Sequence, residues 1–474
     1  MSTFSGLSTA YSGLVAARAG LDVVGQNIAN ANTEGYTRQR VTTSSVAASA
    51  NTGLFTSGAR PGQGVAVDSI ARLGSLQLDA QVRSSSAAAG YQSARADALA
   101  TVESSLQEPG VNGVSGQLQE MWAAWQDLSN RGGDAAAGGI VLSSASVLST
   151  SLADRYTQVE EAWAHQRTTV DTLGAQLNSA AAQVADLNVQ IRTTVASGGN
   201  ANELIDKRAA LTESIASLAG GTVRENTDNT VDVFVGGNAI VSGDSARAVT
   251  VVGSRTMDGA AGSPVALEWA HRPGTPVALD GGRIAGALSV IAPATASGTG
   301  GTLTEVAVTY NSFATQLAAQ VNAAHSAGAT PSGATGLDFF GFTAGLPAAK
   351  GLTVLPKDAS GIAAGTPGAG GADGSVADAI SQLGIGANSP DARWTAFVTT
   401  TAVAAQTEAH HAVLTDLAAN SAKNQQLANS TVDMDEENVN LLMFQHAYQG
   451  AARVMTAVDE MLDVLINRTG LVGR

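Results

Sequence analysis

An apolar repeat at each end of the chain constrains its fold most strongly. Near the N-terminus, side chains at steps of three or four residues fall on one face of a helix: Leu7, Tyr11, Leu14, Ala17, Leu21, Val24 and Ile28. Near the C-terminus, the same alternation runs through four heptads in the a/d pattern of a coiled-coil seam: Leu441, Phe444, Tyr448, Ala451, Met455, Val458, Leu462 and Leu465. Either stripe alone is also typical of the core face of an ordinary amphipathic helix. Two stripes at opposite termini are better explained by pairing with each other.

The interior predicts a second and longer helical bundle. Residues 140–197 contain no Pro and keep apolar side chains at steps of three and four, so they predict one helix of roughly 87 Å. A helix of that length is typical of a rod-like domain. Gly198-Gly199 and Gly220-Gly221 end this helix and the next one. Further helices are predicted over residues 84–107, 115–130, 303–325 and 393–427.

Residues 222–292 do not keep the helical spacing of apolar side chains. They contain short β-branched runs separated by turn formers, which predicts a small antiparallel β domain inserted into the rod. Residues 330–392 are predicted to be loop with a few strands, and residues 41–83 an extended connector. The expected fold is mainly α, with terminal helices (1–40 and 431–474) pairing as a coiled coil, a helical rod (84–221 and 293–430) and an outer β domain (222–292).

Composition excludes several classes of protein. The chain has no Cys, so a disulfide framework, a thiolate metal site and a cysteine nucleophile are impossible. The net charge of −15 argues against nucleic acid or an anionic membrane as a partner. No run reaches the roughly 18 to 20 uninterrupted apolar residues of a membrane span, and the first residues lack the pattern of a cleavable signal. We expect a cytosolic protein, or one that leaves the cell by a route that reads no such signal.

The sequence offers no catalytic constellation. Its six His form no H-E-x-x-H motif, and the adjacent pair His410 and His411 would point in different directions on a helix. There is no nucleophile elbow and no phosphate-binding loop. Asp435, Glu436 and Glu437 are interpreted as acids that complement the positive end of a helix dipole. We therefore expect no enzyme activity, no cofactor and no metal.

One local motif is unusually dense. Asn27, Asn30 and Asn32 follow one another at the end of the first predicted helix, before Gly35 and Tyr36. Asn side chains bond to nearby backbone and tolerate left-handed conformations, so the segment should end the helix and turn the chain. A helix stop needs only one Asn or Gly. So dense a cluster indicates a specified surface.

Residues 27–39 resemble the signature of the flagellar rod, hook and hook-associated axial proteins. The extension Thr37-Arg38-Gln39 is most similar to the hook-associated members that join hook to filament. Residues 62–83, 336–340 and 433–463 resemble other segments of those members. Residues 431–434 and Asn438 depart from the usual pattern, which bears on local capping.

The resemblance implies a structural function at the hook–filament junction of the bacterial flagellum, outside the cell. It implies export in an unfolded state through the flagellar type III apparatus, without a cleavable signal, and assembly at the hook tip through coupled folding of the terminal helices. The implied partners are further copies in a helical tube, hook protein on one side, the next junction protein on the other, and an export chaperone at the C-terminal helix. No nucleic acid or membrane is implied.

In that tube the terminal helices would line the inside, and the β domain would point outward. The residues expected at the assembly interface are those of the two stripes and the signature: Leu7, Tyr11, Leu14, Leu21, Val24, Ile28, Asn27, Asn30, Asn32, Gly35, Tyr36, Leu441, Phe444, Tyr448, Ala451, Met455, Val458, Leu462 and Leu465. The alternatives are another axial protein, of the flagellin or hook type, and an exported enzyme or type III translocator.

Overall fold

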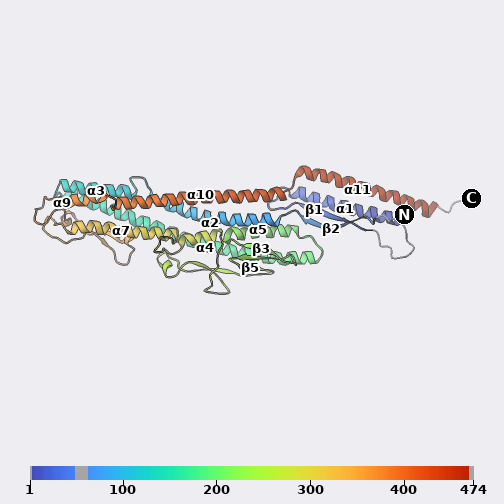
Figure 1. The fold of residues 1–474 in the computed structure, drawn as a ribbon, viewed down its shortest axis with the longest axis horizontal. Coiled ribbons are helices and arrows are strands. Elements are labelled where there is room, and N and C mark those ends of the chain that lie inside the picture. Colours follow the sequence, from blue (N-terminus) through green and yellow to red (C-terminus); the bar gives the residue numbers. More distant parts are fainter. Residues whose placement is uncertain (1–2, 48–61, 469–474) are drawn as a thin grey trace, which may run out of the picture.

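The computed structural model describes residues 3–47 and 62–468. The protein is an elongated, mainly helical rod, and its first and last helices lie side by side at one end (Figure 1). The predicted class, mainly α with a small inserted β domain, is confirmed.

The terminal region consists of two helices and a hairpin. Its elements are α1 (Thr3–Asn30), β1 (Gln39–Ser45), β2 (Val65–Arg72) and α11 (Met434–Asp463), which continues as a π-helical turn, η4 (Val464–Arg468). β1 and β2 pair antiparallel, and both contact α1.

The extended connector expected over residues 41–83 needs correction. Its start and middle form the β1–β2 hairpin, and helix α2 (Leu76–Leu106) begins eight residues before the predicted start. The reason is local: Ser75 caps α2, its Oγ accepting a hydrogen bond from the Leu78 amide at 3.4 Å. Residues 48–61 of the expected connector lie outside the described residues, as do residues 1–2 and 469–474 of the expected terminal helices.

The rod is built around one very long helix. This helix, α4 (Ala135–Ala196), has 62 residues and extends about 93 Å at 1.5 Å per residue, so the predicted long helix is present. The other long rod helices are α3 (Val114–Asn130), α5 (Asn202–Ala219), α6 (Gly282–Ile291), α7 (Thr302–Ser326) and α10 (Pro390–Ser430). Among the described residues, α4 alone is long and apolar enough to cross a membrane by length and composition, and 44% of that apolar window is buried in the protein.

Aromatic side chains anchor the core of the rod. The largest fully buried ones are Trp125, Trp163, Trp394, Tyr310, Phe339 and Phe340. Two of their four polar groups are hydrogen-bonded: the indole of Trp163 donates to the Ile291 carbonyl at 3.0 Å, and that of Trp394 to Glu108 at 2.9 Å. The Trp125 indole and the Tyr310 hydroxyl have no partner among the described residues. Tyr310 stacks on Trp394 with ring centroids 5.8 Å apart. Because such side chains bury large areas, the rod has a substantial core despite its many Ala residues.

Two small sheets form the β insert. β3 (Thr222–Glu225), β4 (Val231–Val235), β5 (Asn238–Ser242) and β6 (Ser245–Ala246) make one antiparallel sheet in sequence order, and β7 (Val249–Val252) pairs with β8 (Ala266–Trp269). The expected boundary at residue 292 is wrong, because residues 282–291 form α6, which packs against α2. Ile284, Ala287, Val290 and Ile291 have helical spacing and are buried there.

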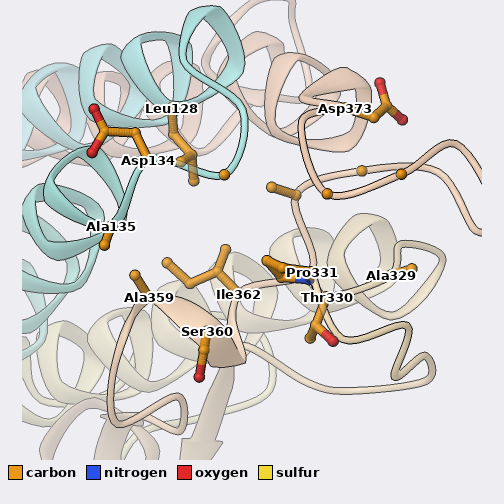
Figure 2. A pocket seen from close by; sticks show the side chains of 15 residues that line it. Leu128, Asp134, Ala135, Ala329, Thr330, Pro331, Ala359, Ser360, Ile362 and Asp373 are labelled. Carbon is orange, nitrogen blue, oxygen red and sulfur yellow. The ribbon is translucent and has the colours of Figure 1, made fainter.

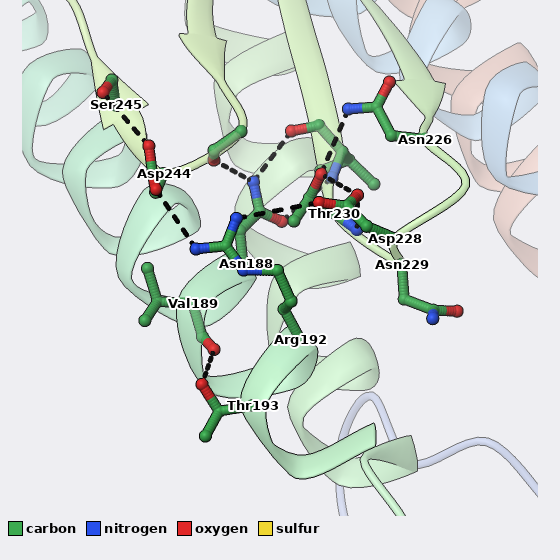
Figure 3. Close-up of polar contacts among 12 residues, drawn as sticks. Asn188, Val189, Arg192, Thr193, Asn226, Asp228, Asn229, Thr230, Asp244 and Ser245 are labelled. Atoms are coloured by element: carbon green, nitrogen blue, oxygen red, sulfur yellow. Dashed lines mark hydrogen bonds and ion pairs between the residues drawn. The ribbon is translucent and has the colours of Figure 1, made fainter. Parts of the chain in front are cut away.

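An asparagine of α4 fixes the first of these sheets to the rod. Asn188 is fully buried, and its amide group pairs with the backbone of Val231: Oδ1 accepts from the amide at 3.1 Å, and Nδ2 donates to the carbonyl at 2.8 Å (Figure 3). Nδ2 also donates to the Gly243 carbonyl at 2.6 Å. One turn away, Arg192 makes an ion pair with Asp244 at 3.2 Å. The backbone groups of the first residue of β4 are thereby satisfied by a helix side chain.

The same device recurs elsewhere in the rod. Asn178 of α4 pairs with both backbone groups of Val249 at 2.8 Å each. Asn322 of α7 pairs likewise with Phe340, at 2.8 Å each, in β9 (Phe340–Phe342). β9 pairs antiparallel with β10 (Leu352–Val354), and two short helices, α8 (Ala348–Gly351) and α9 (Ser375–Ser381), lie in the same segment. Residues 330–392 are thus largely loop with two short strands, as predicted, plus short helices that were not.

Candidate assembly interface

Helices α1 and α11 pair antiparallel in a seven-residue register. A methyl group built on Gly6 would lie 3.7 Å from Val458 Cγ2, and one on Gly13 would lie 3.9 Å from Ala451 Cβ. Seven residues further along α1, Gly20 faces the ring of Phe444. A register that advances by seven on one helix and falls by seven on the other follows a single seam, which we call the glycine seam (Gly6, Gly13 and Gly20 facing Val458, Ala451 and Phe444).

The two helices approach each other most closely at Gly20. A Cβ atom at this position would come within 2.5 Å of two Phe444 ring atoms, closer than packed atoms approach. The predicted pairing of the terminal helices is therefore present, but on α1 it runs along glycines beside the leucine stripe. Leu7, Leu14 and Leu21 each follow a seam glycine in sequence and are half-buried. Small residues let helix backbones approach, and glycines leave no mark in a pattern of large apolar side chains.

The predicted interface residues divide into three groups. Those that are buried within this chain are Val24, Asn27 and Val458. Those that are half-buried are Leu7, Leu14, Leu21, Ile28, Asn30, Tyr36, Leu441, Phe444, Ala451, Met455 and Leu462. Those that are exposed are Tyr11, Asn32, Gly35, Tyr448 and Leu465. The predicted α11 residues Phe444, Ala451 and Val458 thus lie against α1. Tyr11 of α1, by contrast, is 60% exposed.

A second apolar surface lies on α11, outside the seam. It consists of Val439, Leu442, Met443, Val454 and Met461, each more than half exposed. At about 3.6 residues per turn, Val439 and Leu442 fall opposite Phe444, while Met443, Val454 and Met461 fall on one flank of the helix between that side and the seam. We call them the outer face of α11. Several exposed apolar side chains on one helix are typical of an interaction site.

The asparagine signature closes the base of the helix pair. Asn27, only 1% exposed, pairs with the backbone of Gln39: its Oδ1 accepts from the amide at 3.0 Å, and its Nδ2 donates to the carbonyl at 2.8 Å. Tyr36 donates its hydroxyl to Asn27 Oδ1 at 2.9 Å. Nδ2 also reaches Glu437 of α11 at 3.2 Å. The first asparagine of the signature therefore joins α1, β1 and α11.

The other signature residues shape the turn. Asn30 donates to the Gln26 carbonyl at 3.0 Å and accepts from the Thr33 hydroxyl at 3.2 Å, which ends α1 locally. Gly35 has a φ of +77°, in the left-handed region that suits glycine. Asn32 is exposed. The cluster thus combines one buried anchor with local turn chemistry.

A charged contact that the sequence analysis missed joins the signature to the C-terminal acids. Arg38 Nε donates to Glu437 at 2.7 Å, and its Nη2 lies 2.7 Å from Glu436. The hydrogen bond with Glu436 raises the pKa of Arg38, and the same contact lowers the pKa of Glu436. Asp433 is the N-cap of α11 and accepts from the Asp435 and Glu436 amides, and the three acids that follow it lie in the first turn of the helix. The sequence does hold a signal for this contact, since the signature contains one Arg and three acids stand together before the C-terminal stripe.

Burial and nearby negative charge also act on Tyr36. Burial, followed by Asp206, Glu203 and Glu437, raises the pKa of the Tyr36 phenol to about 12. The group stays neutral at physiological pH and can donate its hydrogen bond to Asn27.

A cavity of about 190 Å³ lies in the rod, between the α3–α4 turn and the loops at residues 329–331 and 359–373 (Figure 2). Its two carboxylates are used in local capping: Asp134 accepts from the Ala136 amide at 2.8 Å, and Asp373 from the Thr366 amide at 2.6 Å. Figure 2 shows both carboxylates turned away from the cavity. In the described part of the chain, no group of three or more His, Asp or Glu side chains is placed to hold a metal.

Three family models match this chain. The model of the flagellar hook-associated protein FlgK helical domain covers residues 99–340, just over half of the chain. The flagellar basal body rod protein model covers residues 7–37, and the C-terminal model of the flagellar basal body rod FlgEFG proteins covers residues 423–468. The two terminal matches include α1 with most of the signature, and α11.

Similar proteins agree with these matches. The chain is 29% identical over its full length to all of flagellar hook-associated protein 1 of Bacillus subtilis. The protein of the same name from Escherichia coli is 27% identical over 70% of this chain and 59% of its own. The structure of the flagellar hook junction protein FlgK from Burkholderia pseudomallei aligns with a TM-score of 0.64 at 15% identity, over 74% of this chain and 99% of that one, which shows the fold. The chain therefore belongs to the flagellar hook-associated protein FlgK family, whose members are structural parts of the flagellum and not enzymes.

Proposed function

We propose that this protein is the junction between hook and filament and that its terminal helices complete their folding on assembly. The observation that carries the proposal is the unpartnered apolar surface of the helix pair: the outer face of α11 together with Tyr11 and Val15 of α1. A structural role in the flagellum, with self-assembly and association with hook protein, follows from family membership. The junction role needs a partner for this surface, and a further copy in the tube supplies it.

Coupled folding is supported by how little the terminal pair buries on its own. On α11, only Glu437 and Val458 are buried among the described residues, and the seam facing α11 is formed by glycines. Glycine loses more conformational freedom on folding than any other residue, so the seam is costly to order. Neighbouring subunits supply the missing burial, and ordering occurs when they are present.

The composition of the chain suits export in an unfolded state. The chain has no Cys, so no disulfide must form after passage through a narrow channel in an unfolded state. Export uses no cleavable signal, hook protein lies on one side and the next junction protein on the other, and a chaperone covers the outer face of α11 before export. The terminal helices line the tube and the β insert points outward. Membership of the FlgK family favours this reading over a flagellin or hook-type protein, and over an enzyme or translocator.

The assembly role is tested by deleting residues 439–474 in a motile host. Loss of most of α11 should leave hooks without filaments, because the helix pair and its outer face are both lost. Electron microscopy of detached hooks provides the measurement, and the amount of secreted protein must be measured alongside it. The matched control re-expresses the full-length chain in the same strain. Filaments of normal length on the deletion strain would refute the role.

Coupled folding is tested by limited proteolysis of the dilute, full-length chain. The protease should trim residues before α2 and after α10 first, and should spare a fragment from about residue 76 to residue 430. The sequence alone predicts the same fragment over about 84–428, so the cleavage sites also check the corrected start of α2. Mass spectrometry of the fragments reads the boundaries. Protected ends in the dilute monomer would contradict coupled folding, while hook capping by the full-length chain would be unaffected.

A further inference from the structure

The hydrophobic core stops short of the terminal region. Its continuous cluster of buried apolar side chains runs from Ala98 to Trp394 in sequence and, among the described residues, includes none from α1, β1, β2 or α11. Yet the terminal region contacts the rod at the ends of α2, α5 and α10. Hydrogen bonds and ion pairs join the two regions there.

Asp206 of α5 is the first element of this attachment. It is 7% exposed, and its two carboxylate oxygens hold two segments of the terminal region. One accepts from the Thr37 amide at 3.0 Å, and the other from Arg72 Nε at 2.5 Å. Arg72 also faces Asp79 of α2 at 3.8 Å, and Asp79 accepts from Gln426 of α10 at 2.6 Å. One chain of charged and polar side chains thus extends from β2 to three rod helices.

Asn202 of α5 supplies a second contact. Its Nδ2 donates to the Gln39 side-chain oxygen at 3.0 Å and to the Ile70 carbonyl at 2.9 Å. Gln39 is itself buried, and its backbone is held by Asn27 of α1. The rod therefore binds the side chain of Gln39, while α1 binds its backbone.

Arg38 lies between Thr37 and Gln39 in sequence and contacts a third part of the protein. Its amide donates to the Ser430 carbonyl at the end of α10, at 2.8 Å, and its carbonyl accepts from the Leu73 amide at 2.9 Å. Its side chain bonds Glu436 and Glu437 at the start of α11. Three consecutive residues thus contact α5, the α10–α11 junction and α1.

We propose that Thr37, Arg38 and Gln39 form a latch that docks the terminal pair on the rod only when α11 is in place. The physical reason lies in Glu437, which is 1% exposed and contacts both Arg38 and Asn27. Without it, Asn27 Nδ2 and Arg38 Nε each lose a charged acceptor, and the segment that Asp206 and Asn202 must bind is held less firmly in its turn. Capture of the C-terminal helix is thereby transmitted to the rod. This inference rests on the proposed coupled folding.

The test needs a terminal pair that is held together without assembly. The chain has no native Cys, and a Cβ on Gly13 would lie 3.9 Å from Ala451 Cβ, within the usual disulfide range of roughly 3.5 to 4.5 Å. The variant Gly13→Cys/Ala451→Cys of the full-length chain therefore closes α1 on α11 when it is oxidised. Amide exchange at residues 37, 38 and 39 then reports the three directions of the latch.

Closing the disulfide should slow exchange of all three amides at least tenfold, and Glu437→Gln in that background should remove the protection of all three together. Glu437 bonds none of these amides, so only a coupled latch moves them. Glu460→Gln, an exposed acid of the same helix, is the matched control and should change nothing. Protection that survives Glu437→Gln, or loss confined to residue 39, would overturn the latch. Because no assembly is involved, that result would leave the hook-capping test of the proposed function untouched.

Discussion

The rod and the terminal pair solve the same packing problem in opposite ways. In the rod, Trp125, Trp163 and Trp394 are buried among long helices, so the core is complete within one chain. In the terminal pair, Gly13 and Gly20 bring two helices together along a narrow seam, and most of α11 is exposed. The comparison teaches that one chain can carry both a finished domain and a domain that needs neighbours.

The largest effect should come from removing a rod anchor. Trp163→Ala leaves a cavity and the unsatisfied Ile291 carbonyl, and should lower the free energy of unfolding by about 3 to 5 kcal/mol. Its counterpart in the other region, Phe444→Ala, should leave the rod unchanged, because α11 contributes nothing to the described core. Denaturant unfolding followed by far-UV circular dichroism compares the two. Equal destabilisation by both variants would erase the distinction between the regions.

A smaller effect should follow from widening the glycine seam. Gly20→Ala places a methyl group against the Phe444 ring and should weaken the helix pair by about 1 to 3 kcal/mol. Gly13→Ala is the matched control, since its methyl would make only ordinary contact with Ala451 and alanine favours the helix. Thermal unfolding of α1 and α11 in assembled junctions, with swimming as a second readout, separates the variants. A Gly20→Ala protein that matches the control would mean that the helices do not pack along this seam.

Tyr36→Phe should lower the stability of the terminal region by about 1 kcal/mol at neutral pH, because it removes the hydroxyl bonded to Asn27. Its second consequence depends on pH. The folded-state pKa is raised to about 12 from 10.0, so this contribution to stability is present below pH 10 and is lost as pH rises toward 12. Protection of the Gln39 amide in the disulfide-closed chain, followed from pH 9 to 11, measures it. An alkaline loss of the same size in Tyr36→Phe would exclude the phenol as its cause.

Protonation of His325 in the rod should have the smallest effect on stability at neutral pH. Its Nδ1 bonds the Leu337 carbonyl at 2.7 Å and its Nε2 accepts from the Ala363 amide at 2.9 Å, an arrangement that needs the neutral ring. Burial lowers the pKa of His325, so stability is present above the ordinary value of about 6.5 and falls as pH drops below it. Melting of the rod from pH 7.5 to 5 should show this fall. The exposed His410 serves as control: if His410→Gln abolished the acid loss, the assignment to His325 would be wrong.

Helical periodicity was readable wherever a helix buries one face within its own chain. The long helix near residues 140–197 and the helices near 115–130 and 303–325 matched the observed elements within a few residues. The start of α2 and the helix α6 were missed, because eight extra residues before Ser84 and a ten-residue apolar run inside a strand-rich region give weak periodic signals. The β insert could be located, but its attachment by Asn178 and Asn188 could not. A single polar residue on a helix carries no mark of the strand it will bind.

The candidate interface shows the same division. Sequence determined that both termini are amphipathic helices, that residues 27–39 form a specified turn, and that acids precede the last helix, since these properties depend on neighbours a few residues apart. Only the tertiary structure decided which faces meet: Gly20 against Phe444, and Asn27 against Glu437, 410 residues away in sequence. Periodicity defines a face but not its partner. The partner is chosen by close approach and by the need to satisfy buried polar groups, and both exist only once the chain has folded.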